Sequence, residues 1–387
     1  MHKQTLALLL LLWPSAILFG QDPFSLHFFG NQSVFNPALT GHRGALSADF
    51  KVKSQWASAR VANFRSARIN VEESLPCSIL DYGLQLGFDE EGDGRFQTLD
   101  GALKFAGTLP FVGPNSVHNI RVGAALGWSQ KRIDFSRLVF SDQLDAKYGN
   151  IFGTSFTPPN GGESRVFFTP SLGLAYKALL NAGARQATSL AAGVSLHNAY
   201  SLGEDIFGNE ESVLGFGARI PARFSAFVEA EFIPYASRRS FFSIRPLLLM
   251  ERQGEDLWRP GGRLSYVEAG ARFSLNRALG LGIFYHFNGR PAADGFHTNW
   301  FTFTAEAGTV FGSSSNQRVD LGFAYSNNFT GLRNAVGALY EFTLSFHLLS
   351  SPGCRIMGRP GGGPGQQMPC PAMRASSRQK LFENIWY

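Results

Sequence analysis

The chain has 387 residues, of which 36 are Phe and 43 are Gly, while only 17% are charged and the formal net charge is +6. A chain of this length suggests two or three soluble domains, but a composition rich in aromatic residues and glycine and poor in charge argues against them. Much of the positive charge lies at the C-terminus, at Arg355, Arg359, Arg374, Arg378 and Lys380. This placement favours a solvated tail over a basic face that binds nucleic acid.

The first twenty residues have the order of a secretory signal peptide. Lys3 precedes a short apolar run at 6–12, and small or apolar residues lead to Gly20, after which cleavage would leave Gln21 as the mature N-terminus. No later segment offers eighteen consecutive apolar residues for a transmembrane helix. An exported chain without such a helix can sit in lipid only as a closed β-barrel, because only closure satisfies every backbone hydrogen bond there.

Alternation with a period of two is the dominant pattern from residue 44 onward. In the clearest run, 80–89, Leu, Tyr, Leu, Leu and Phe alternate with Asp, Gly, Gln, Gly and Asp. Outer-membrane strands have about ten residues with apolar side chains facing lipid and polar ones facing the lumen. We therefore predict an all-β fold, a transmembrane antiparallel β-barrel of about 14 strands, at 44–56, 60–71, 80–89, 95–109, 118–131, 165–178, 188–198, 214–233, 240–251, 263–274, 279–288, 299–311, 318–327 and 337–348.

One predicted strand, 214–233, is interrupted by Pro221, which marks either a bulge or a division into two shorter pieces. The predicted organisation is a signal peptide at 1–20, an N-terminal periplasmic lead-in at 21–43, the barrel at 44–348 and a Gly/Pro-rich periplasmic tail at 349–387. With both ends in the periplasm, the connections after odd-numbered strands should be the longer ones. This holds from the fifth strand onward, and the longest connection, 132–164, is predicted to be an exposed surface loop.

No catalytic constellation is visible, so we expect no enzyme activity, no cofactor and no metal site. The histidines are scattered, and the acidic segment 89–94 is flanked by strand patterns where a calcium-binding EF-hand needs helices, which favours a plain hairpin turn. Two of the three cysteines, Cys354 and Cys370, lie outside the barrel on a segment flexible enough to let them meet. We predict that they form a disulfide, with two idle thiols as the alternative and Cys77 as the odd thiol.

Several short motifs occur in an order that is typical of one protein family. Segment 35–41 reads Phe-Asn-Pro-Ala-Leu-Thr-Gly, Gln55-Trp56 end the first strand, segment 140–145 reads Phe-Ser-Asp-Gln-Leu-Asp, Tyr340-Glu341 open the last strand and Cys370-Pro371 follow in the tail. Together they resemble the PorP/SprF family of type IX secretion system membrane proteins over about residues 21–371. The chain departs from the family at Tyr340, where many relatives have a histidine, and in its further sixteen residues after Pro371.

The resemblance implies a non-enzymatic outer-membrane component that docks, exports or anchors a secreted or cell-surface protein, in some bacteria an adhesin of gliding motility. The implied partners are outer-membrane lipid, the type IX machinery or an associated periplasmic lipoprotein, and a secreted or surface adhesin-like protein, with no nucleic acid. The residues that could contact a partner are Asn36, Pro37, Gly41, Gln55, Trp56, Asp142, Gln143, Asp145, Tyr340 and Glu341.

Two of these residues have a simpler interpretation, because Trp56 and Tyr340 would also suit an aromatic girdle at the membrane interface. Glu341 differs from them, since it falls on the lumen-facing register. The competing function is a general porin or small-solute channel, because a barrel of fourteen strands is wide enough for a solute path if nothing fills it. A soluble exported β-sandwich is a third class and predicts release without detergent.

Overall fold

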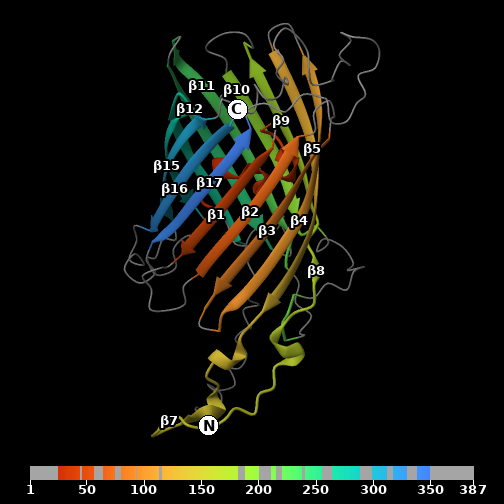
Figure 1. The fold of residues 1–387 in the computed structure, drawn as a ribbon, viewed down its shortest axis with the longest axis vertical. Coiled ribbons are helices and arrows are strands. Elements are labelled where there is room, and N and C mark those ends of the chain that lie inside the picture. Colours follow the sequence, from red (N-terminus) through yellow and green to blue (C-terminus); the bar gives the residue numbers. More distant parts are fainter. Residues whose placement is uncertain are drawn as a thin grey trace, which may run out of the picture.

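The computed structural model describes residues 25–43, 46–55, 64–74, 80–92, 94–112, 116–181, 188–199, 211–214, 220–237, 240–254, 264–287, 299–311, 317–328 and 338–348. Fourteen long strands form the wall of a barrel (Figure 1). They are β1 (Ser47–Gln55), β2 (Phe64–Ser74), β3 (Leu80–Glu91), β4 (Phe96–Val112), β5 (Ser116–Arg132), β9 (Ser171–Leu180), β10 (Thr188–His197), β11 (Arg223–Ala236), β12 (Phe241–Gln253), β13 (Leu264–Leu275), β14 (Leu279–Phe287), β15 (Trp300–Phe311), β16 (Gln317–Asn328) and β17 (Leu339–Leu348).

The barrel is closed by the pairing of its first and last strands. Every long strand pairs antiparallel with its neighbours in sequence, and β1 also pairs with β17, from Ser47 opposite His347 to Gln55 opposite Leu339. Closure leaves no long strand with an unpaired edge, which is the condition for crossing a bilayer with strands. The predicted fold class, a 14-strand transmembrane β-barrel, is confirmed.

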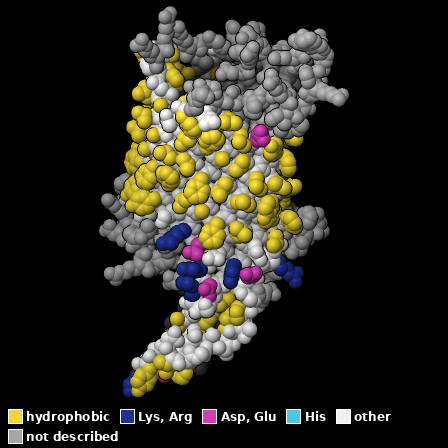
Figure 2. All heavy atoms as spheres, in the orientation of Figure 1, with side chains coloured by type: hydrophobic (Ala, Val, Ile, Leu, Met, Phe, Trp, Pro, Cys, Tyr) yellow, Lys and Arg dark blue, Asp and Glu magenta, His cyan; other side chains and the backbone are white. Residues whose placement is uncertain are grey.

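Alternation along each strand separates the two faces of the wall. On β3 the side chains of Leu84 and Leu86 are 41% and 45% exposed on the outside, whereas Asp81 and Asp89 are buried inside. Figure 2 shows hydrophobic side chains spread over the outer wall, with charged ones gathered in a band toward one end. Exposed apolar side chains would be unfavourable in water, but they carry no free-energy cost on a surface that faces lipid.

Prolines account for the main differences from the predicted strands. The expected strand 165–178 begins as the short β8 (Phe167–Phe168) and resumes as β9 after Pro170, because proline has no N–H for the ladder. The expected strand 214–233 starts only at Arg223, after Pro221, so Pro221 precedes the strand and does not interrupt it. The register irregularity of β11 lies instead between Phe232 and Tyr235, around Pro234.

The two ends of the barrel differ in their connections. At one end lie the short connections 75–79, 113–115, 181–187, 237–240, 276–278 and 312–316, and β17 ends there. At the other end lie longer ones, among them 198–222, 288–299 and the segment between β5 and β9, although 92–95 is short. Short turns face the periplasm and long loops face outward in outer-membrane barrels, so we call these the short-turn end and the long-loop end.

The segment between β5 and β9 extends away from the barrel beyond the long-loop end (Figures 1 and 2). It contains five short elements besides β8: η3 (Phe135–Arg137), η4 (Ser141–Gln143), β6 (Leu144–Asp145), β7 (Gly149–Asn150) and η5 (Pro159–Gly162). Within the described ranges, no helix has the length and apolar character needed to cross a membrane. The expected signal peptide, the tail 349–387, Trp56 and all three cysteines lie outside the described residues.

Candidate functional site: the plug inside the barrel

Residues 25–43, here called the plug, lie inside the barrel. They form three short helical turns, η1 (Phe28–Gly30), α2 (Gln32–Phe35) and η2 (Pro37–Leu39), seen within the barrel wall in Figure 1. Leu26, Ala38 and Thr40 are 0% exposed. These residues are the described part of the segment 21–43, which the sequence predicts to be a periplasmic lead-in, and most of their side chains are buried against the lumen-facing wall.

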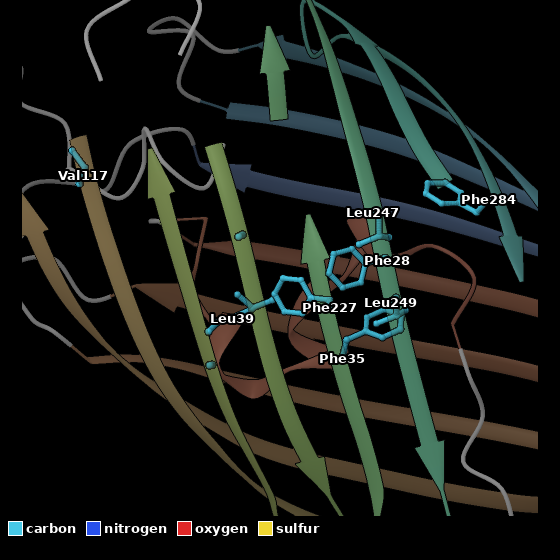
Figure 3. Packing of buried hydrophobic residues seen from close by; sticks show 11 residues of the cluster. Phe28, Phe35, Leu39, Val117, Phe227, Leu247, Leu249 and Phe284 are labelled. Carbon is cyan, nitrogen blue, oxygen red and sulfur yellow. The ribbon is translucent and has the colours of Figure 1, made fainter. Parts of the chain in front are cut away.

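The apolar side of the plug packs against β11, β12 and β14. The Phe28 ring lies 5.1 Å from that of Phe35 and 5.2 Å from that of Phe227, measured between centroids. Leu247, Leu249 and Phe284 complete the same buried cluster, and Figure 3 shows several of its members close together. Burying one such side chain contributes about 1.5–3 kcal/mol. The lumen of this barrel therefore carries an apolar patch where the plug meets it.

Glu341 on β17 holds the N-terminal end of the plug. Its carboxylate accepts hydrogen bonds from the backbone N–H groups of Leu26 at 3.0 Å and His27 at 3.2 Å, and from the Ser25 hydroxyl. Lys51 on β1 lies 2.9 Å from the same carboxylate and donates to the Ser25 hydroxyl. Since Glu341 is 1% exposed, this charge is stable only because these donors surround it.

Arg121 on β5 holds the C-terminal end of the plug. Its guanidinium group donates to the carbonyl oxygens of Ala38 at 2.7 Å and Thr40 at 2.5 Å, and pairs with Asp81 on β3 at 2.7 Å. Arg121 is 0% exposed, so almost every donor it has is turned to the plug or to the wall. The plug thus links β17 and β1 at one of its ends to β5 and β3 at the other.

Asn36 lies at the centre of the plug. Its Nδ2 atom donates to the backbone carbonyl oxygens of Leu174 on β9 and Val194 on β10, both at 3.0 Å, while its Oδ1 atom accepts from the Ala38 N–H. The carbonyl oxygen of neighbouring Phe35 accepts from the Ser195 hydroxyl at 2.6 Å. One asparagine therefore ties the turn of the plug to two adjacent strands.

Three glycines on the wall leave the room that this turn occupies. A β-carbon on Gly173 would lie 2.0 Å from Oδ1 of Asn36, and one on Gly123 would lie 2.4 Å from the backbone of Pro37. A β-carbon on Gly193 would come within 2.8 Å of Nδ2 of Asn36. Any larger residue would overlap the plug, so Gly123, Gly173 and Gly193 form a glycine seat for the Asn-Pro-Ala turn.

Gly41, near the C-terminal end of the plug, has a left-handed conformation, with φ +67°, that favours glycine. Its N–H donates to Glu72 on β2 at 3.0 Å, and a β-carbon there would lie 2.7 Å from that of Asp81. Among the predicted site residues, the structure therefore brings Asn36, Pro37, Gly41 and Glu341 together at the plug. All four are buried: Asn36, Pro37 and Gly41 lie against the wall, and Glu341 on the wall contacts the plug.

The other predicted site residues lie apart from the plug. Gln55 ends β1 at the long-loop end, and Tyr340 lies on the lipid-facing side, 42% exposed, with its ring 5.5 Å from that of Tyr325. Asp142, Gln143 and Asp145 belong to the segment between β5 and β9, residues 133–170, here called the long loop. Arg121, Glu72 and the glycine seat were not predicted from the sequence. The signal that could have identified them is a charged residue or a glycine at a lumen-facing position of a predicted strand.

The long loop is held in shape by its own carboxylates. Asp142 accepts from the backbone N–H and the hydroxyl of Ser155 and from the Thr154 hydroxyl, and Asp145 accepts from the N–H groups of Lys147 and Tyr148. The backbone N–H of Ser155 is the main cause of the lowered pKa of Asp142. Hydrogen bonds from the Lys147 and Tyr148 backbone lower the pKa of Asp145 in the same way.

A cavity lies on each side of the plug. The larger, about 220 Å³, is lined by Ser33 and Pro37 of the plug and by Phe64, Glu91 and Phe96 near the long-loop end. The smaller, about 100 Å³, is lined by His27 and Phe29 of the plug and by residues near the short-turn end. Within the described part of the chain, no cluster of three or more His, Cys, Asp or Glu side chains is arranged to hold a metal ion.

Solved structures of outer-membrane barrels resemble this chain at low identity. A Pseudomonas aeruginosa FadL homologue is 10% identical with a TM-score of 0.39, covering 85% of this chain and 99% of its own. The Acinetobacter baumannii outer membrane protein Omp33 is 7% identical with a TM-score of 0.34, covering 78% and 98%. The Ralstonia pickettii toluene transporter TbuX is 9% identical with a TM-score of 0.36, covering 81% and 92%. At such values the likenesses carry no argument about function.

No curated protein matches the chain in sequence. The model of one protein family, described as type IX secretion system membrane protein PorP/SprF, matches residues 17–346. That range includes the plug, the glycine seat and nearly all of the closed barrel. The chain belongs to the PorP/SprF family of type IX secretion system membrane proteins, and its barrel is an outer-membrane barrel.

Proposed function

We propose that this type IX secretion barrel is a non-enzymatic docking platform that exports or anchors a secreted or cell-surface protein, and that it is not a general solute channel. The observation that carries the proposal is the plug. A porin needs a continuous aqueous path through its lumen. Here the lumen holds a segment fixed at both ends by Glu341 and Arg121 and seated on three glycines.

The long loop is the surface that a partner outside the cell would meet. Its exposed side chains include Leu144 at 53%, Tyr148 at 67%, Ile151 at 54% and Phe152 at 53%. Apolar side chains gathered on a shaped, water-exposed element are typical of protein interaction sites. In this proposal the loop binds the secreted or adhesin-like protein, while the type IX machinery or a periplasmic lipoprotein meets the short-turn end.

Photo-cross-linking in living cells tests the docking role. Benzoylphenylalanine is placed at Tyr148 on the long loop and, as a matched control, at Leu281 on the lipid-facing wall, where the side chain is 66% exposed. The proposal predicts a cross-link to a protein that carries a secretion signal from position 148 and none from position 281. If position 148 gives no such product in cells that secrete normally, the long loop is not the docking surface.

Conductance in planar bilayers tests the alternative function. The purified full-length barrel should give no steady open channel, because the plug fills its middle. Graded uptake of sugars into vesicles that contain the wild-type protein would support the porin instead.

A further inference from the structure

The cavity at the short-turn end is lined mainly by arginines. We call it the arginine cavity, and its charged lining consists of Arg43, Arg245, Arg272, Arg277, Arg318, Glu306 and Asp320, with His27, His42 and His347 beside them. It holds about 100 Å³, the room of a small chemical group. Arg277 lies in the turn 276–278 and Arg318 is the second residue of β16, so both stand at the mouth of the barrel.

Positive charge exceeds negative charge on the surface of this cavity. Five guanidinium groups face it against two carboxylates. Three carboxylates outside the lining pair with these arginines: Glu229 lies 3.4 Å from Arg245, Asp49 lies 2.7 Å from Arg43 and Glu231 lies 3.8 Å from Arg277. Since these three acids do not line the cavity, the lining itself carries more guanidinium groups than carboxylates.

Arg277 has guanidinium N–H donors that are not hydrogen-bonded to a carboxylate. Its nearest carboxylate oxygen, on Glu231, is 3.8 Å away, too far for a hydrogen bond, and its side chain is 33% exposed. Its carbonyl oxygen accepts from the guanidinium group of Arg318, which brings the two arginines together. Burial, followed by the charges of Arg245, Arg318 and Arg272, lowers the pKa of Arg277 against the opposing effect of Glu231. An added anion would relieve this crowding of positive charge.

The backbone at Arg277 is also unusual. Asn276 and Arg277 both have positive φ, 53° and 54°, in a turn that Asn and Gly fit best. A long charged residue at such a position is unfavourable for the turn itself. An asparagine at position 277 would therefore fit this turn better than arginine.

The plug forms the floor of the arginine cavity. The guanidinium groups of Arg245 and Arg272 lie 4.9 Å and 5.6 Å from the centroid of the Phe29 ring. Arg272 also pairs with Glu306, and Glu306 lies 2.8 Å from His27 of the plug. A ligand that attracts Arg272 would therefore compete for the contact that holds His27.

We propose that the arginine cavity binds a carboxylate presented by an acidic peptide segment of a periplasmic protein. Guanidinium groups bind carboxylates through paired hydrogen bonds, which suits a cavity lined by several of them. Arg277 and Arg318 lie at the short-turn end, which faces the periplasm in outer-membrane barrels, so the carboxylate is taken to arrive on a segment from the periplasm and not on a lipid. This binding site rests on the part of the proposed function that places a periplasmic partner at the short-turn end, and it names the chemistry by which that end would bind the partner.

Fluorescence anisotropy with the full-length protein in detergent and a labelled hexaglutamate peptide tests the proposal. The variant Arg277→Asn removes the charge and suits the turn, so the barrel should still fold, as heat-modifiable migration on gels will report. The matched control is Arg95→Asn, which removes an arginine with φ 43° from a turn at the long-loop end. Loss of a charged hydrogen bond should weaken binding about tenfold in Arg277→Asn and leave Arg95→Asn equal to wild type.

Three results would overturn the proposal. The first is the absence of peptide binding to the wild-type barrel, and the second is equal binding by wild type and Arg277→Asn. The third is binding of inorganic phosphate, measured by displacement of the peptide or by calorimetry, without binding of hexaglutamate, which would make the cavity a small-anion site. Because the assay uses purified protein and no secreted partner, its outcome does not depend on the role of the long loop.

Discussion

A β-carbon on Gly173 would lie 2.0 Å from the Oδ1 atom of Asn36, so the strand glycine and the plug asparagine cannot both keep their places if the glycine gains a side chain. The two residues are far apart in sequence, and neither has an evident role alone. Their contact explains the Asn-Pro-Ala motif as the turn that seats the plug on the wall.

The variant Gly173→Ala should displace the plug. The added methyl group overlaps Asn36, and overpacking of this kind destabilises by about 1–3 kcal/mol. The measurement is conductance in planar bilayers, where the variant should open more often than wild type. Gly153→Ala in the long loop is the control, since a β-carbon there meets nothing within 4 Å. Equal closed behaviour of Gly173→Ala and wild type would show that the glycine seat does not hold the plug.

The variant Glu341→Gln should destabilise the barrel by about 3–5 kcal/mol, because Lys51 is then buried without its counter-charge. Urea unfolding in lipid vesicles measures the change. Glu163→Gln breaks an exposed ion pair, in which the side chain of Arg132 is 63% exposed and that of Glu163 is 46% exposed. This variant should cost at most about 1 kcal/mol. The double variant Lys51→Met with Glu341→Gln should recover part of the loss. If the double variant is less stable than Glu341→Gln alone, the two charges are not coupled.

The variant Leu84→Arg should cost about 2–4 kcal/mol, because it places a charge on the lipid-facing wall near mid-strand. The neighbouring variant Gln85→Arg should be much milder, because Gln85 lines the cavity at the long-loop end. Heat-modifiable migration on gels compares the folding of the two proteins. Similar losses for both would contradict the inward and outward assignment of β3.

The variant Asp142→Asn should loosen the long loop. Folding lowers the pKa of the Asp142 carboxyl, so its contribution is present above the ordinary Asp value of 3.8 and is lost as the pH falls through the lower folded value. Hydrogen exchange of residues 140–156 at pH 7 should be faster in the variant than in wild type. Wild type should keep its protection, after correction for the intrinsic exchange rate, until the pH falls below 3.8. Unchanged protection in the variant would show that the Ser155 and Thr154 contacts do not order this loop.

The strands could be predicted from the sequence because lipid and lumen impose opposite demands on neighbouring residues. Alternating segments such as 80–89 follow directly from those demands, and the lengths of the connections then distinguish the two ends of the barrel. The effects of Pro170 and Pro221 on the strand boundaries were harder to predict. Pro170 separates β8 from β9 and Pro221 precedes β11, and whether a proline interrupts a ladder depends on the strand that lies opposite.

The plug could not be predicted in this way. Its helical turns are three or four residues long, too short for any periodicity, and its position depends on residues such as Arg121, Leu174 and Glu341 that lie far along the chain. The Asn-Pro-Ala motif was recognised by its family resemblance, but a motif does not state what it touches. The residues that this motif contacts are identified only by the three-dimensional structure of the lumen.

Photo-cross-linking from inside the plug tests directly whether residues 25–43 occupy the lumen of the barrel. Benzoylphenylalanine replaces Phe28, an aromatic residue that packs on Phe227 and on the cluster with Leu247 and Leu249. After irradiation of the outer membrane and proteolysis, mass spectrometry should find position 28 joined to peptides of β11 or β12 in the same chain. Cross-links from position 28 to other periplasmic proteins, with none to β11, β12 or β14, would contradict a plug inside the barrel.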